Sequence, residues 1–140
     1  MLRLYDSLTQ RQAALPPPGR PISLYVCGIT PYDATHLGHA FTYCSYDVLV
    51  RFLEWQGAPV RYVQNVTDID DDVLRRSRAE GQGWRTLGDR WVRRFIDDMI
   101  ALNVRPPDLY PRATDAIPDM IRAIEFLLAR RLAYERDGWV

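Results

Sequence analysis

The sequence contains no lysine: all 18 of its basic side chains are arginine, and they balance 18 acidic side chains to a net charge of zero. Without lysine, residues 1–140 can neither form a Schiff base with a substrate nor supply the lysine of a P-loop. A net charge of zero also gives no basic footprint of the kind that nucleic-acid-binding domains carry. Two kinds of lysine chemistry are therefore excluded, and the composition offers no support for nucleic-acid binding.

Cysteine is scarce and long apolar runs are absent. Cys27 and Cys44 are too few for a disulfide framework, so we expect a reduced, cytoplasmic setting. No run approaches the roughly 18 apolar residues that cross a membrane, and the N-terminus lacks the apolar stretch of a signal peptide. We expect a single cytoplasmic domain with its own core and no membrane partner.

The first half of the sequence has the pattern of a strand, a helix and a second strand. ISLYVC (22–27) and VRYVQNV (60–66) are β-rich apolar runs, and Gly57 ends the helical stretch 40–56 between them. Its apolar residues recur every three or four positions, which predicts a buried face of Phe41, Cys44, Val48, Phe52 and Trp55. Such a unit has parallel strands, and its ligands bind at the carboxyl ends of the strands.

The second half of the sequence is predicted to be helical. A polar helix is expected over 68–80, with Gly81 as its stop, followed by a helix from Thr86 to Leu102 and a last one that Thr114 caps. The proline-rich stretch 103–112 is predicted to be a loop. The apolar faces of the last two helices are predicted to be Trp91, Phe95, Ile96, Met99 and Leu102, and Ile117, Ile121, Ile124, Leu127 and Leu128.

Two clusters flank this helical half. Four carboxylates follow the second strand, and we interpret most of them as helix caps rather than as a metal or amine site: Asp68, Asp70, Asp71 and Asp72. Near the end of the sequence, Asp137-Gly138 indicates a tight hairpin turn. Its second strand would be only two residues long, so the edge at 133–140 is predicted to favour self-association.

The pentapeptide THLGH (35–39) contains both histidines of the chain and lies where the first strand passes into the helix. A helix N-terminus offers unpaired N–H groups and a partial positive charge, which suit a phosphate. Gly38 leaves room for a nucleotide, and two imidazoles can stabilise charge in a transition state. The position favours a functional pair over the alternative that His36 and His39 are ordinary capping residues.

Cys27 ends the first strand, and three interpretations of it stay open. As a nucleophile it would need a base, for which His36 or His39 could serve. As a zinc ligand it would need two or three further ligands. It could also be a small buried apolar residue, which is how we interpret Cys44. At the end of the second strand, Asn65 and Thr67 are better ligand candidates than the carboxylates that follow them.

The segments YVCGITPYDATHLGHAFTY (25–43) and YVQNVTDIDD (62–71) together resemble the N-terminal catalytic half of cysteinyl-tRNA synthetases. They are equally similar to the related cysteine ligases of mycothiol biosynthesis. THLGH resembles the HIGH signature of the family, PRAT (111–114) resembles the synthetases more, and ITPYDATHLGHA (29–40) leans toward the mycothiol enzymes. The resemblance implies an α/β, Rossmann-like parallel sheet with flanking helices, of which residues 1–140 form the N-terminal part as one truncated catalytic domain.

The resemblance also implies a reaction and a set of site residues. The family activates cysteine with ATP to cysteinyl adenylate and passes the acyl group to tRNA(Cys) or, in the mycothiol enzymes, to an amino sugar. Carried over, His36 and His39 are the catalytic residues, and Cys27 is a ligand of the zinc ion that binds the substrate thiolate. ATP or adenylate contacts would come from Gly28, Ile29, Thr30, Gly38, Thr42, Asn65, Val66 and Thr67.

The second signature of the family, KMSKS, and its remaining zinc ligands have no counterpart in this sequence. We therefore expect the chain alone to lack half of the ATP site and not to hold zinc tightly. Our interpretation is a cysteinyl-tRNA synthetase-like protein. The alternatives are a mycothiol-type cysteine ligase and a truncated module that binds ATP or an adenylate without catalysis. Another HIGH-bearing nucleotidyltransferase fits less well because of Cys27 and NVTDIDD (65–71).

Overall fold

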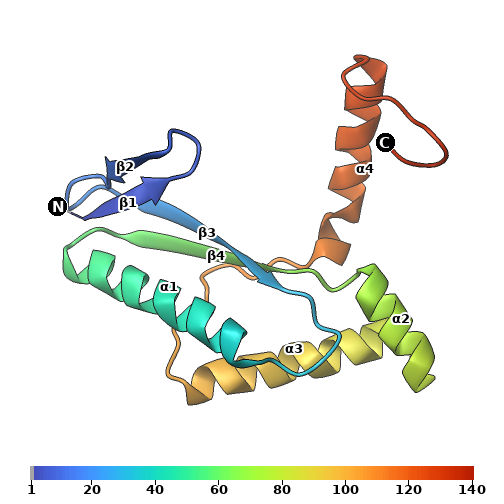
Figure 1. Cartoon of the computed structure of the whole chain (residues 1–140), viewed down its shortest axis with the longest axis horizontal. Coiled ribbons are helices and arrows are strands. Elements are labelled where there is room, and N and C mark those ends of the chain that lie inside the picture. The colour runs from blue at the N-terminus through green and yellow to red at the C-terminus, as the bar shows by residue number, and fades with distance from the viewer. Residues whose placement is uncertain (1) are drawn as a thin grey trace. The chain divides into compact units, whose positions relative to one another are not determined.

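The computed structural model describes residues 2–140. Their elements follow the order β1, β2, β3, α1, β4, α2, α3, α4 (Figure 1). The chain forms two compact units: the first contains residues 2–26, 35–64 and 94–109, and the second contains 27–34, 65–93 and 110–140. Across the described residues, no helix has the length and apolarity that a membrane crossing requires.

The first unit opens with a hairpin that the sequence does not predict. β1 (Arg3–Asp6) and β2 (Arg11–Ala14) pair antiparallel. The Asp6 carboxylate holds the turn because it accepts hydrogen bonds from the Leu8 N–H at 3.0 Å and from the Thr9 hydroxyl at 2.7 Å. Both strands are exposed at nearly every position, so they carry no alternation of apolar and polar residues that would reveal them.

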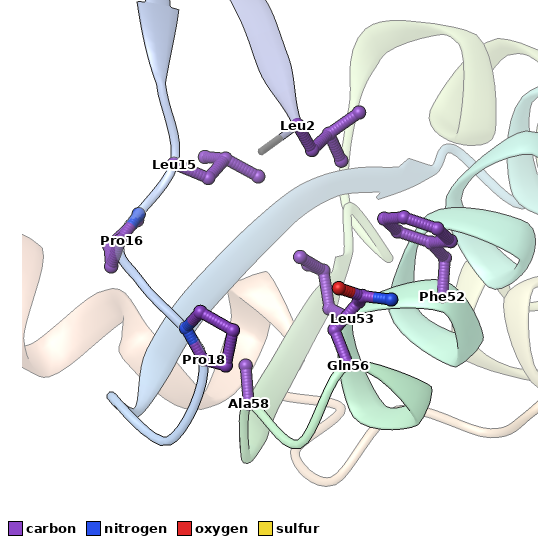
Figure 2. Close-up of a pocket in the computed structure, with 8 residues that line it drawn as sticks. All are labelled: Leu2, Leu15, Pro16, Pro18, Phe52, Leu53, Gln56 and Ala58. Carbon is purple, nitrogen blue, oxygen red and sulfur yellow. The ribbon is translucent and has the colours of Figure 1, made fainter.

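The proline-rich connector after the hairpin lines an apolar pocket of about 190 Å³ in the first unit (Figure 2). The connector and the chain start face the C-terminal end of α1 across this pocket. Its lining consists of Leu2, Leu15, Pro16, Pro18, Phe52, Leu53, Gln56 and Ala58. None of these belongs to the site residues predicted from the sequence.

The central sheet pairs β3 (Ile22–Ile29) with β4 (Val60–Val66). The Ile22 N–H donates to the Pro59 carbonyl at 2.8 Å in the first unit, and the Thr67 N–H donates to the Ile29 carbonyl at 2.9 Å in the second. From the first bond to the second, the residue numbers increase along both strands, so the strands run parallel, as predicted. The bounds of β4 are those predicted, and β3 is two residues longer than expected because it continues through Gly28.

The stretch 103–112, predicted to be a loop, pairs with β4 at two positions. The Gln64 N–H donates to the Leu109 carbonyl in the first unit, and the Val66 N–H donates to the Pro111 carbonyl in the second. Proline lacks an N–H but keeps its carbonyl, so a proline-containing segment can still accept bonds along a sheet edge. The loop that the prolines predicted is therefore wrong at these two positions, where the chain pairs with β4.

α1 (Leu37–Trp55) buries a different face from the one predicted. The buried residues are Tyr43, Asp47, Val50 and Leu53. Of the predicted face, Cys44 is half-buried, and the others are exposed: Phe41, Val48, Phe52 and Trp55. Asp47 interrupts the true apolar stripe, and its carboxylate tolerates burial because it accepts bonds from the Arg105 N–H at 2.8 Å and the Arg51 guanidinium at 2.7 Å. Because a charged residue lies on the buried face, a search for apolar residues at helical spacing does not find that face.

Three glycine-dependent turns are confirmed. Gly57, directly after the cap residue of α1, has φ 81°, and Gly81, which ends α2 (Asp71–Glu80), has φ 64°. Asp137 and Gly138 have φ 53° and 81° and join Arg136 to Trp139 by an antiparallel bridge. Positive φ at both central residues is the signature of the two-residue hairpin turn that the sequence predicts.

The caps of the second unit are only partly as predicted. Asp70 caps α2 by accepting from the Asp72 N–H at 2.9 Å, which confirms the capping interpretation for the acidic run. α3 (Trp84–Ala101) begins before Thr86, so that residue lies inside the helix rather than at its cap. α3 buries Phe95 and Met99 as predicted, but it also buries Leu87 and Val92, while Trp91 is half-buried and Ile96 and Leu102 stay exposed.

α4 (Ala113–Ala129) departs furthest from expectation. Its N-cap position is Arg112, which makes no side-chain capping bond, so the predicted cap at Thr114 is wrong. No residue of this helix is buried. Its predicted apolar face, which includes Ile117, Ile121 and Ile124, is therefore not covered by residues 2–140.

Candidate active site

The ends of β3 and β4 approach each other unusually closely in the second unit. The Gly28 N–H donates to Asn65 Oδ1 at 2.7 Å. A Cβ atom built on Gly28 would lie 1.4 Å from the Asn65 carbonyl oxygen, so no larger residue fits without moving the backbone. The need for glycine here comes from the neighbouring strand and holds without any ligand.

The remaining strand-end residues fall into two groups. Ile29 and Val66 have buried side chains, so they can reach a ligand only through their main chains. Thr30 and Thr67 are half-buried, and the Thr67 hydroxyl accepts a bond from Asn65 Nδ2 at 3.2 Å. The structure thus brings the predicted residues of 28–30 and 65–67 together at one edge of the sheet.

Cys27 also lies at this edge and is exposed. The alternative that it is a buried apolar residue is therefore wrong. Within residues 2–140 no group of three or more histidine, cysteine, aspartate or glutamate side chains is arranged to hold a metal ion. Because zinc sites use three or four protein ligands, Cys27 by itself does not make one.

The two histidines form a reciprocal cap on α1 in the first unit. His36 Nδ1 accepts from the Gly38 N–H at 3.1 Å, and the His36 N–H donates to His39 Nδ1 at 3.3 Å. Their rings stack with centroids 4.0 Å apart. The capping interpretation is thus confirmed for both residues. It does not exclude a functional role, because each neutral ring that accepts at Nδ1 carries its proton at Nε2 as a remaining donor.

The electrostatics of this helix start favour a neutral His39 ring and suit a bound anion. Burial, with a smaller contribution from the neighbouring His36, lowers the pKa of His39 below its usual 6.5. The first turn of α1 contains no acidic residue that would offset the positive end of the helix dipole.

Gly38 and Thr42 serve this helix start in ways that the sequence does not reveal. A Cβ atom on Gly38 would lie 2.9 Å from two atoms of the His36 ring, so the glycine makes room for the cap itself. The exposed Thr42 hydroxyl donates to the Gly38 carbonyl at 3.0 Å. The structure brings His36, Gly38, His39 and Thr42 together within two turns of one helix.

Two supporting residues have partners that the sequence does not predict. The Thr35 hydroxyl donates to Asp98 Oδ2 at 2.8 Å and so ties the start of the histidine segment to α3 within the first unit. In the second unit, buried Asp68 accepts from the Thr114 N–H at 3.0 Å and from the Thr114 hydroxyl at 2.6 Å. Asp68 therefore holds the first turn of α4 rather than capping α2, and both contacts join residues that are far apart in sequence.

Asp68 also borders a polar pocket of about 310 Å³ in the second unit. The Arg112 guanidinium lies between two carboxylates, 2.6 Å from Asp89 and 3.7 Å from Asp68. Its hydrogen bond to Asp89, followed by the charges of the nearby carboxylates, raises the pKa of Arg112. Arg112 and these two carboxylates pair with one another, and Asp68 supports the start of α4 beside the pocket.

A parallel strand–helix–strand unit with a glycine near the end of β3 and paired donors at the helix start defines an α/β protein of the Rossmann type. Residues 16–140 match the family model described as tRNA synthetases class I (C) catalytic domain. The chain belongs to this family.

The relatives agree with this assignment. The chain is 52% identical over 133 residues to an L-cysteine:1D-myo-inositol 2-amino-2-deoxy-alpha-D-glucopyranoside ligase of Mycolicibacterium smegmatis, covering 95% of this chain and 32% of the relative. It is 45% identical over 139 residues to a cysteine–tRNA ligase of Cyanothece sp., covering 98% of this chain and 28% of the relative. The chain therefore spans about a third of the length of these relatives.

A solved structure shares the fold. The methionyl-tRNA synthetase of Mycobacterium tuberculosis in complex with methionyl-adenylate is 28% identical, with a TM-score of 0.64. The match covers 69% of this chain and 19% of that one. The α/β fold of a class I synthetase, expected from the sequence, is thereby confirmed.

Proposed function

We propose that this chain forms the first part of a catalytic domain that activates cysteine with ATP. In the proposed reaction a carboxylate oxygen of cysteine attacks the α-phosphorus of ATP, the new O–P bond forms, and the bond to pyrophosphate breaks. The products are cysteinyl adenylate and pyrophosphate. Membership of the class I (C) family supports the proposal, together with relatives named as ligases of cysteine to tRNA and to an amino sugar.

One observation carries the proposal furthest: the reciprocal histidine cap leaves two Nε2–H donors at the start of α1. Negative charge builds on the phosphate oxygens during the attack, and donors fixed in advance stabilise such charge without reorganising. We assign this role to His36 and His39. The lowered pKa of His39 keeps its ring neutral near pH 7, which preserves both the cap and the outward donor.

From the family resemblance, we also propose that the strand ends of the second unit contact the adenylate. Gly28 lets the backbone of β3 run close to β4, and Thr30 and Thr67 offer hydroxyl groups at the same edge. Ile29, Val66, Gly38 and Thr42 would contribute through their main chains or by shaping the two segments. Cys27 is proposed as one zinc ligand, with the further ligands drawn from outside residues 2–140.

We propose tRNA(Cys) as the acceptor of the activated cysteine and the cytoplasm as the place of the reaction. The amine of an amino sugar is the second candidate acceptor. It is supported by amino-sugar ligases that are 50–52% identical to this chain, although another of these ligases is 45% identical, the same as the cysteine–tRNA ligase. Both acceptors follow the same first step, so the site described above serves either one.

Calorimetry with a non-hydrolysable cysteinyl-adenylate analogue tests the proposal. His36→Asn is the informative variant, because asparagine is a good N-cap but has no imidazole donor. We expect the unmodified chain to bind the analogue and His36→Asn to bind it at least fivefold more weakly with unchanged helix content. Leu8→Ala, on the exposed hairpin turn, is the control that should bind normally. Equal binding by His36→Asn and the unmodified chain would contradict the role assigned to the histidines.

A further inference from the structure

We propose that Asn65 is a positioning residue that brackets the ends of β3 and β4 and fixes the direction in which the Thr67 hydroxyl donates. The inference deepens the proposed function and rests on it, because it assumes that these strand ends face the adenylate. The sequence suggested that Asn65 touches the ligand itself. In the structure, its side-chain amide forms hydrogen bonds with Gly28 and Thr67.

The orientation of the Asn65 amide follows from chemistry. The Gly28 N–H can only donate, so the atom 2.7 Å from it must be the acceptor, Oδ1. The amide nitrogen is thereby turned toward Thr67, whose Oγ1 lies 3.2 Å away. Swapping the two amide atoms would place two donors face to face at Gly28. The bracket therefore has one chemically consistent arrangement.

This arrangement determines what Thr67 can offer a ligand. Because Asn65 Nδ2 donates to Oγ1, the hydroxyl proton of Thr67 points away from Asn65. A hydroxyl held in this way donates to an acceptor atom such as a phosphate or carboxyl oxygen. We therefore assign the Thr67 proton to an oxygen of the adenylate, while the second lone pair of Oγ1 stays available as an acceptor.

The same bracket also changes the role of Gly28. Its N–H is occupied by Asn65, so it is not available to a ligand. What Gly28 contributes is the absence of a side chain, which lets β3 approach the Asn65 carbonyl. A side-chain bond and a backbone approach between the same two residues are separate observations, and both describe one clamp across the strand ends.

Asn65→Asp separates positioning from direct contact. Aspartate has nearly the same shape and keeps the acceptor for Gly28, but it replaces the donor to Thr67 with a second acceptor. The Thr67 proton then turns inward to the new carboxylate and is lost to the ligand. Two readouts are needed: hydrogen exchange of the Gly28 amide by NMR without ligand, and the dissociation constant of the cysteinyl-adenylate analogue by calorimetry.

Five results are expected. Gly28 stays protected from exchange in Asn65→Asp and loses at least tenfold protection in Asn65→Ala. Thr67→Val weakens analogue binding about tenfold in the unmodified chain but less than twofold in the Asn65→Asp chain, because there the hydroxyl no longer serves the ligand. Asn103→Asp, at the other asparagine of the chain, is the matched control for the added negative charge and should bind normally.

Each contrary result is decisive. Equal losses from Thr67→Val in both backgrounds would mean that Asn65 does not direct the hydroxyl, and the proposal would be overturned. If the Gly28 amide stays equally protected in Asn65→Ala, the Asn65 side chain does not hold the ends of β3 and β4 together. If the unmodified chain fails to bind the analogue, the proposed function fails and the role given to Thr67 fails with it. The exchange of Gly28 would still decide whether the bracket exists.

Discussion

Replacing Gly28 with alanine would place a methyl group inside the backbone of the neighbouring strand. The added carbon would lie 1.4 Å from the Asn65 carbonyl oxygen and 2.5 Å from its carbonyl carbon. Neither atom can rotate away, because both belong to the main chain of β4. Contact at ordinary carbon–oxygen distances of about 3.3 Å therefore requires the two strand ends to separate by roughly 2 Å.

The expected cost follows from the bonds that this separation breaks. The bond from the Gly28 N–H to Asn65 Oδ1 and the bond from the Thr67 N–H to the Ile29 carbonyl both cross the gap. Each contributes about 1 kcal/mol net. Overpacking a tight site adds about 1–3 kcal/mol. We expect Gly28→Ala to lower the free energy of unfolding by about 3–5 kcal/mol.

Urea denaturation followed by tryptophan fluorescence, which reports on the half-buried Trp91 of α3, measures this effect. With a slope of about 2 kcal/mol per molar urea, the midpoint should fall by about 2 M. Gly88→Ala is the matched control: in α3 the added carbon would meet Asp68 and Pro31 at 3.8 Å, an ordinary contact. Since alanine is the better helix former, this control should gain about 0.5–1 kcal/mol. A Gly28→Ala midpoint within about 0.3 M of the unmodified chain would refute the reasoning.

Two further predictions concern caps. Asp68→Asn should lower the free energy of unfolding by about 1–3 kcal/mol, because a neutral amide removes the charge that strengthens both bonds to Thr114. In urea denaturation, the double variant Asp68→Asn, Thr114→Val should lose less stability than the sum of the losses of the two single variants. Losses that simply add would contradict the contact. The lowered pKa of His39 means that its contribution to stability is present above pH 6.5 and is lost as the pH falls through that lowered pKa. NMR should show the His36 amide losing its bond to His39 as the His39 ring becomes protonated, and an amide shift that stays unchanged while that ring titrates would count against the reciprocal cap.

The sequence predicted the parts of the fold that depend on local chemistry. The bounds of β4 are as predicted because its run of β-formers is interrupted at both ends. Gly57, Gly81 and Gly138 adopt positive φ where turns were expected, since few other residues tolerate that conformation. The family resemblance rested on motifs of this same local kind, and the family assignment confirms it.

The errors arise where distant residues decide. The buried face of α1 contains Asp47, whose burial depends on the Arg105 amide 58 residues away. Asp68 looked like part of a cap on α2, but its partner is Thr114, 46 residues later. Asn65 lies at the end of the second strand, as predicted, yet its bond to Gly28 spans 37 residues, and no local pattern encodes it. Pairings of this length are invisible to propensity and periodicity.

The uncovered apolar face of α4 has a consequence for the cooperativity of unfolding. A helix of 17 residues with no buried side chain gains little from tertiary packing, and an isolated helix of this length is marginal in water. Its amides should therefore exchange with solvent through local opening, long before those of α1, whose Val50 is fully buried. A stability measured from whole-chain helicity would mix these two processes, so the all-or-none description applies to the sheet and α1 and not to α4.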